Sequence, residues 1–300
     1  MANNIVLGAE VLSAFQESLF AGEKTADLVN AGNFKFGMMK TVQVLKTDIA
    51  DLKQYNRATG YGDAGVVSAT YQNMEMEADL YQKFGVDRED NIEQKMQTIA
   101  SVLAEAGIKI KKTADFYRLS KIAGASNIQS ATPANLTTGS AVVNALDVAE
   151  SKILDNDSEL SDCNLYITPT IYTLLKREIG DKSGRFMLAS DDYNNKIEYY
   201  DGMKVVVVPQ TRMYVGVTLN STTHVWEATA DNNNAKSPVN FMIVNRTSVV
   251  CPLKVDEIKF IDNSINPDSR EDLICPNIYF DAFVLDKREK GVYVHAAVAR

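Results

Sequence analysis

The residue types best suited to catalysis or metal binding are few in this sequence and lie far apart. The 300 residues include two histidines, His224 and His295, and three cysteines, Cys163, Cys251 and Cys275. No cysteines have the CxxC spacing of zinc or redox sites, and the histidines lack metal-ligand spacing. We therefore expect free thiols, histidines with structural roles, and no metal or cofactor.

Motifs that build active sites are also missing. The chain contains no GxGxxG after a strand, no Walker loop, no HExxH and no GxSxG. We therefore predict that the protein is not an enzyme. An α/β hydrolase or transferase with an unrecognised active site within 135–250 stays open as an alternative, because a catalytic triad is defined by geometry and not by sequence order.

An acidic run superficially resembles a calcium loop. It consists of Asp155, Asp157, Glu159 and Asp162. Counted from Asp155, position 6 is Leu160 where such loops have Gly, and position 12 is Tyr166 where they have Glu. We interpret the run as an acidic loop that follows a helix.

A basic cluster lies on a long predicted helix. Its members are Lys109, Lys111, Lys112, Arg118 and Lys121. Two interpretations stay open: a solvated helix face, or a patch that contacts nucleic acid or acidic partner surfaces. The net charge of −8 argues against a broad basic face that wraps nucleic acid.

The helix that carries these lysines is predicted over 90–123. Apolar residues recur along it at steps of three and four, which is the pattern of an amphipathic helix. Asp90 and Glu93 have the spacing of a capping box at its start, and Gly124 is the expected stop. Gly107 is a possible kink.

Residues 41–86 are predicted to form one long hairpin with a glycine-rich tip. On the return limb, Met74 and Met76 alternate with Glu75 and Glu77, which indicates a strand with one apolar face. A long two-stranded ribbon is not stable alone in water, so we expect it to rest on another subunit. Residues 1–35 have the pattern of an arm with a short helix that must lie on something else.

The remaining chain alternates element types and then becomes rich in strands. We predict a helix over 140–154 and a second helix that begins at Pro169. A turn is expected at Asp201-Gly202, and segments 278–285 and 292–295 are expected to form a hairpin. The sequence has no apolar run long enough for a membrane helix and no signal peptide.

Five segments, in this order, resemble the major capsid protein family of tailed bacteriophages, which has the Hong Kong-type shell fold. They are YNRATGY at 55–61, MEMEADLYQKFGVDRED at 74–90, ADFYRLSKIAG at 114–124, YDGMKVVVVP at 200–209 and YFDAFV at 279–284. The resemblance implies an α+β fold. Its parts would be an N-terminal arm at 1–35, an extended β-hairpin loop at 36–89, a peripheral domain with a spine helix from 90–134 and 251–300, and an α/β axial domain at 135–250.

The resemblance also implies a function. Such a subunit would assemble into pentamers and hexamers of an icosahedral head in the host cytoplasm, with scaffolding and portal proteins as partners, and would enclose double-stranded DNA in the virion through weak contacts. The extended loop would lie over a neighbouring subunit, with Lys53, Tyr55, Arg57, Tyr61, Met74 and Met76 as its interface residues. An encapsulin-type compartment shell is an alternative within the same fold.

Overall fold

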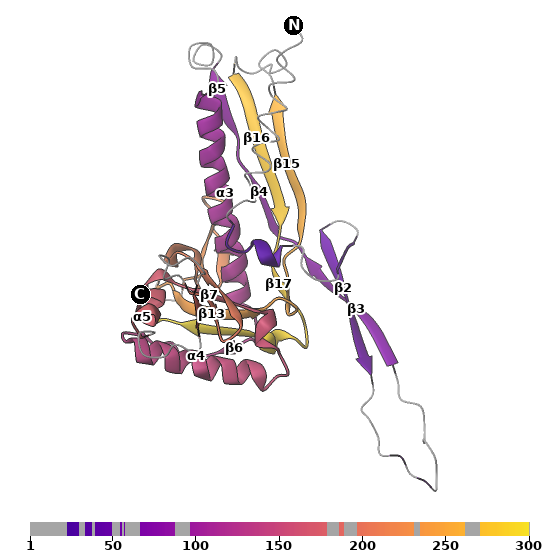
Figure 1. Cartoon of the computed structure of the whole chain (residues 1–300). Helices are drawn as coiled ribbons and strands as arrows, with labels where there is room; N and C mark the ends of the chain where they lie inside the picture. Colours follow the sequence, from indigo (N-terminus) through magenta and orange to yellow (C-terminus); the bar gives the residue numbers. More distant parts are fainter. Residues whose placement is uncertain are drawn as a thin grey trace.

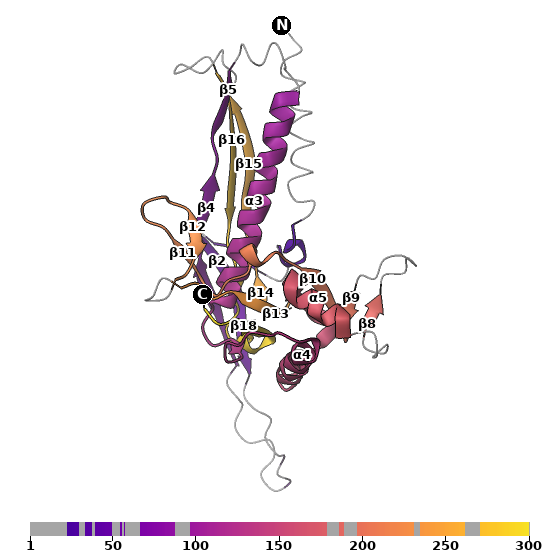
Figure 2. The same ribbon diagram turned by 90° about the vertical axis from the view of Figure 1, so that its left-hand side faces the viewer.

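The computed structural model describes residues 23–29, 34–37, 40–49, 55, 57, 67–87, 97–178, 186–188, 197–230, 235–261 and 271–299. The chain is elongated and combines helices with sheets (Figures 1 and 2). A long helix runs beside a narrow sheet, a wider sheet with its own helices lies at one end of that helix, and a hairpin projects from the junction.

The long helix, α3, spans Gln97–Ala123 without interruption, so Gly107 does not break it. The predicted capping box at Asp90 and Glu93 lies outside the described residues. Gly124 ends the helix, and it is the only residue type that fits, because a Cβ there would lie 2.5 Å from the Cα of Gly216.

A four-stranded antiparallel sheet lies along α3. Its strands are β15 (Leu253–Ile261), β16 (Glu271–Phe280), β4 (Ala78–Tyr81) and β5 (Phe84–Asp87), with β4 and β5 both paired to β16. Ala114 and Tyr117 of α3 pack against Ile278 and Phe280 of β16 in a small apolar core. The prediction of one hairpin over 41–86 was therefore wrong in its extent, because β4 and β5 belong to this sheet.

A seven-stranded mixed sheet forms the second layer. Its strand order is β6 (Gln129–Ser130), β18 (Val292–Ala296), β13 (Val239–Asn245), β7 (Cys163–Ile167), β10 (Met203–Val207), β9 (Ile197–Tyr200) and β8 (Phe186–Leu188). Strands β7 and β10 are parallel neighbours. The central strands are buried on both faces, which explains their nearly continuous apolar sequence.

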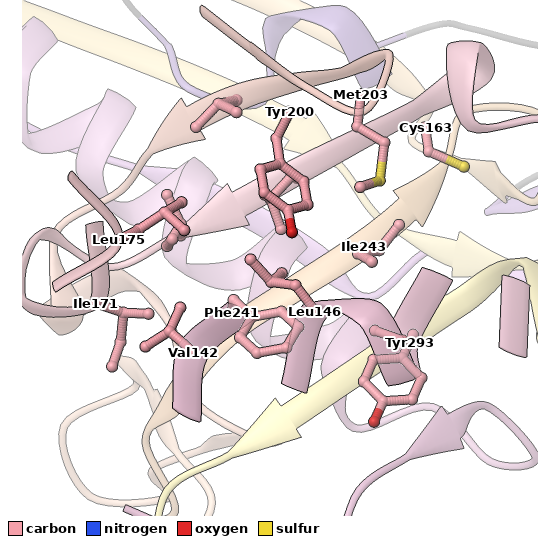
Figure 3. Packing of buried hydrophobic residues seen from close by; sticks show 14 of the residues in the cluster. Val142, Leu146, Cys163, Ile171, Leu175, Tyr200, Met203, Phe241, Ile243 and Tyr293 are labelled. Carbon is pink, nitrogen blue, oxygen red and sulfur yellow. The ribbon is translucent and has the colours of Figure 1, made fainter. Parts of the chain in front are cut away.

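Two helices cover one face of this sheet, α4 (Gly139–Leu154) and α5 (Pro169–Glu178) (Figure 3). The helix predicted over 140–154 is confirmed, and one face of it is buried through Val142, Val143, Leu146, Ala149 and Ile153. The Thr138 hydroxyl caps it by accepting from the Ala141 N–H at 3.3 Å. Pro169 opens α5 as predicted.

The other face of the sheet packs on the last turns of α3. Leu119 and Ile122 of α3 and Leu28 of a short 3₁₀ turn (Ala26–Leu28) lie against Met242 and Val294. The short turn at Ala26–Leu28 and the end of the long helix therefore share one core with the seven-stranded sheet.

The C-terminal strands differ from their prediction. The expected hairpin of 278–285 with 292–295 is wrong: β17 (Phe283–Val284) pairs with β14 (Val249–Val250), whereas β18 lies between β6 and β13. Residues 251–300 were expected to lie with the long helix in one peripheral domain. Strands β15 and β16 do so, but β18 is fully buried and fits a central strand of the other sheet.

The turn predicted at Asp201-Gly202 is confirmed, since φ is +44° at Asp201 and +86° at Gly202 between paired β9 and β10. A further small hairpin consists of β11 (Val217–Leu219) and β12 (Trp226–Ala228). The remaining elements are β1 (Lys35–Phe36), β2 (Thr41–Ile49), β3 (Val67–Glu75) and the 3₁₀ turns Leu160–Asp162 (η2), Gln210–Arg212 (η4) and Glu289–Gly291 (η5).

Candidate assembly interface

The β2–β3 hairpin projects away from both sheets (Figures 1 and 2). Its two strands pair antiparallel over nine residues, from Thr41 opposite Glu75 to Ile49 opposite Val67. Because side chains alternate along a strand, the pairs fall on two faces. Leu45 and Tyr71 share one face, and Val42 and Met74 share the other.

The face with Val42 and Met74 rests on its own chain. Near the base of the hairpin these two residues and Met76 pack with Tyr279 and Leu285 in a buried cluster. Met74 and Met76, which were predicted to contact a neighbouring subunit, are therefore core residues of their own subunit.

Farther out, charged groups brace the same face. Lys46 Nζ lies 3.0 Å from an Asp286 carboxylate oxygen, and Lys287 Nζ lies 2.9 Å from Asp48 Oδ1. Gln72 donates to Asp286 at 3.1 Å and accepts from the Asp286 N–H at 3.2 Å. The described part of the hairpin therefore leans on the turn after β17 and does not depend on another subunit for all of its support.

The opposite face is apolar and uncovered. Leu45 and Tyr71 lie directly across from one another and are 53% and 56% exposed, and Val67 farther out is 69% exposed. Thr47 and Ala69, the pair between them, are also exposed, and none of these side chains carries a charge. Large apolar side chains gathered on one exposed face are typical of a surface that is covered by a partner.

Asp281 fixes the point where the hairpin joins the rest of the molecule. Its buried carboxylate accepts from the Glu77 N–H at 2.8 Å and from the Tyr117 hydroxyl at 3.0 Å, and lies 2.8 Å from Lys121 Nζ. Burial, together with the negative charge of Asp281, raises the pKa of Tyr117, so its hydroxyl stays a donor. One side chain thus ties the strand junction to α3.

A second buried polar cluster fixes the end of the arm. Arg118 Nη1 lies 2.7 Å from Glu23 Oε2, and Asp115 accepts from the N–H groups of Lys24 and Thr25 at 3.0–3.1 Å. Arg212 lies 2.8 Å from Asp115 on its other side. Burial raises the pKa of Glu23, although Arg118 opposes that shift.

The predicted basic patch is divided by the structure. Arg118 is buried, so its prediction as part of an exposed patch was wrong. It forms an ion pair with Glu23 instead. Lys121 forms ion pairs with Asp281 at 2.8 Å and with Glu77 at 3.2 Å. Lys109 and Lys112 are exposed, and Lys111 is half-buried between them.

The structure describes two of the four other interface residues that were predicted in the hairpin loop. Tyr55 and Arg57 are both exposed, whereas Lys53 and Tyr61 lie outside the described residues. Of the predicted arm at 1–35, the structure describes residues 23–29, 34 and 35.

Sequence reasoning missed the two buried polar clusters. Asp115 and Arg118 lie three residues apart on the same stretch of α3 as Ala114 and Tyr117, and Asp281 interrupts a run of aromatic residues. A charged residue inside an apolar stripe was the available signal, because a buried charge requires a partner.

The remaining chemistry-bearing residues are dispersed. His295 is buried, stacks on Phe241 with ring centroids 5.1 Å apart and contacts Asn240 at 3.1 Å, while His224 is in a turn near β12. Within the described ranges, no three His, Cys, Asp or Glu side chains gather in a way that could hold a metal ion. No helix in those same ranges is long and apolar enough to cross a membrane.

Comparison with known proteins gives matches to solved structures only. No family model and no curated protein matches the chain. The capsid structure of the cyanophage P-SCSP1u is similar with a TM-score of 0.62 at 15% identity, covering 91% of this chain and 86% of that chain. The mature capsid of bacteriophage PhiM1 is similar with a TM-score of 0.60 at 12% identity, covering 93% and 86%.

A third solved structure has a different description. The virus-like particle from Pyrococcus furiosus is similar with a TM-score of 0.57 at 12% identity, covering 94% of this chain and 96% of that one. In each comparison the similarity covers most of this chain and most of the matched chain. The α+β shell fold expected from the sequence is therefore confirmed for this chain.

Proposed function

We propose, from the tailed-phage capsid fold of this chain, that it is the subunit of a self-assembling protein shell. In detail, it acts as a major capsid protein that forms pentamers and hexamers of an icosahedral head around double-stranded DNA. The observation that carries the proposal is the β2–β3 hairpin, which projects from the body and holds Leu45, Val67 and Tyr71 on an uncovered face.

The division of the hairpin into two faces supports this function. Its charged face is braced by Asp286 and Lys287 of the same chain, so the strands are held in place before any partner arrives. A preorganised apolar face loses less conformational freedom on binding than a mobile one. In this proposal Tyr55 and Arg57 near the hairpin tip contribute to the same contact, as do Lys53 and Tyr61.

The role is structural and not catalytic in this proposal. The charged pairs with at least one buried member, such as Arg118 with Glu23 and Asp281 with Lys121, join segments of the chain to one another. Partners of the shell are further copies of this chain, a scaffolding protein and a portal, and the assembled protein resides in the virion after assembly in the host cytoplasm. Contact with DNA is weak because the chain has a net charge of −8.

The test is assembly of the purified protein. We expect rings, tubes or closed shells in negative-stain electron microscopy as the protein concentration is raised. A protein that stays a discrete monomer at every concentration, with or without crowding agents, contradicts the proposal.

A compartment shell is the second candidate, since the Pyrococcus furiosus virus-like particle matches over 96% of its length. The two functions differ in cargo. Particles isolated from cells contain nuclease-protected double-stranded DNA if the chain is a phage capsid subunit, and contain a protein cargo if it is a compartment shell.

A further inference from the structure

A groove of about 500 Å³ opens where the middle of α3 faces η4 and the β11–β12 hairpin. Phe116, Val225 and Trp226 give it an apolar and aromatic lining, and Lys112 and Arg212 are its basic residues. Nothing in the proposed role of the hairpin uses this groove.

Lys112 is the exposed lysine of the groove lining, and Lys109 lies one turn before it on α3. Lys109, Lys112 and Phe116 lie at positions i, i+3 and i+7 of α3 and so follow one stripe of the helix. Lys109 and Lys112 are exposed, and no ion pair is found for either within the described part of the chain. Arg212 adds little, because Asp115 lies 2.8 Å from it and balances its charge.

The acidic run noted in the sequence forms an exposed turn between α4 and β7. Asp155, Asp157 and Glu159 are exposed, and no ion pair is found for them among the residues that the structure describes. Leu154, which directly precedes them, is 52% exposed. The turn therefore offers an apolar side chain beside three negative charges, which matches the apolar and positive character of the groove.

The turn and the groove lie beyond opposite ends of the same two strands. The acidic turn leads directly into Cys163, at the amino end of β7. The carboxyl end of β10 leads through Pro209 to Arg212 at the groove. Since β7 and β10 are parallel, with five residues each and about 16 Å of length, the two surfaces are separated by the length of these strands in one subunit.

We propose that the acidic turn at 154–160 of one copy docks into the α3 groove of the next copy. A contact between two different surfaces of identical chains is heterologous, and repeated contacts of this kind form a ring where the rotation between copies closes and an open filament where it does not. The inference deepens the proposed shell function and rests on it, because it names a contact that joins neighbouring copies within one ring.

Charge reversal tests the docking. We expect that Lys109→Glu with Lys112→Glu, or Asp155→Lys with Glu159→Lys, raises the protein concentration needed for rings at least about tenfold, because each change places like charges together. The chain that carries all four changes regains assembly, since the signs are again opposite. Lys290→Glu, an exposed lysine away from the groove, is the control for a change of net charge and assembles as the wild type does.

Cross-linking gives a second readout that does not depend on the stability of rings. In a Cys275→Ser background, Lys112→Cys combined with Asp155→Cys is expected to form a ladder of disulfide-linked multimers under mild oxidation, and each single cysteine variant is not. The other native cysteines, Cys163 and Cys251, are buried.

The outcomes separate the two proposals. If the wild type assembles and the reversed variants assemble equally well, or the fourfold variant is no better than its parents, the docking proposal is wrong and the shell proposal stands. If the wild type itself remains monomeric at every concentration, both proposals are wrong.

Discussion

Arg118 Nη1 lies 2.7 Å from Glu23 Oε2, and both side chains are almost completely buried. The pair joins the end of the arm to the long helix in the interior of the molecule, and Arg118 also lies over the Phe280 ring at 5.0 Å. A charged pair in this position makes the placement of Glu23 depend on the folding of the long helix.

Replacing Arg118 with Met should therefore destabilise the fold strongly. The change leaves Glu23 buried without its cation, which costs about 3–5 kcal/mol in comparable cases. Chemical denaturation measures the free energy of unfolding, with exposed Lys112→Met as the control. The double variant Arg118→Met with Glu23→Gln should be more stable than Arg118→Met alone, and equal stability would contradict the pairing.

The exposed face of the hairpin should govern assembly without governing folding. We expect Tyr71→Asp to raise the concentration required for assembly and to leave the melting temperature almost unchanged, because Tyr71 is more than half exposed. Thr70→Asp is the matched control, since it adds the same charge to the next position on the other face. Equal effects of the two changes on assembly would argue against a one-sided interface.

Asp281 should control the mobility of the strand junction. Asp281→Ala removes the acceptor of the Glu77 N–H, and we expect faster hydrogen exchange in peptides that contain Glu77. Buried groups that lose their partner cost about 1–3 kcal/mol each, so the melting temperature should fall as well. Asp79→Ala, an exposed carboxylate on β4, is the control. Unchanged exchange at Glu77 would show that the strands hold the junction without Asp281.

His295 should make stability fall in mild acid. Burial lowers its pKa from the ordinary value of 6.5, so the unfolded chain binds the proton more tightly than the folded one. The stabilising contribution of the neutral ring is complete above about pH 6.5 and is lost as the pH drops below that value. The measurement is the free energy of unfolding at pH 7.5 and pH 5.5 for the wild type and His295→Gln. A drop of the same size in both would exclude His295 as its cause.

The thiols should differ in reactivity. Burial raises the pKa of Cys163 to about 11 and that of Cys251 to about 12, so neither forms a thiolate readily near neutral pH. Cys275 is only partly buried. We expect a thiol reagent at pH 8 to modify at most one cysteine per chain in the native protein and three after denaturation. Rapid native modification of two or more would contradict the burial of Cys163 and Cys251.

Local patterns in the sequence predicted local structure well. The apolar spacing from Val142 to Ile153 gave the correct buried face of α4, and Asp201-Gly202 adopts the expected turn, because both depend on neighbours a few residues away. Strand partners were less predictable. The alternation of Met74 and Met76 indicates a buried face but carries no information on whether its own chain or another buries it.

The candidate interface also depends on strand pairing that the sequence does not predict. Leu45 and Tyr71 are far apart in sequence, and their shared face follows from the register of β2 with β3, which no local pattern specifies. Arg118 was assigned to a surface because of its charge, and its burial depends on Glu23, 95 residues away.

The position of β18 between β6 and β13 has a consequence for biosynthesis. The seven-stranded sheet has an open gap until residues 292–296 have been made, so ribosome-bound chains that lack them cannot close the core shared by α3 and the arm. Nascent chains on one messenger RNA are close together, and premature contacts between incomplete subunits would produce aggregates. The core that α3 shares with Leu28 is therefore complete only once residues 292–296 have joined the sheet.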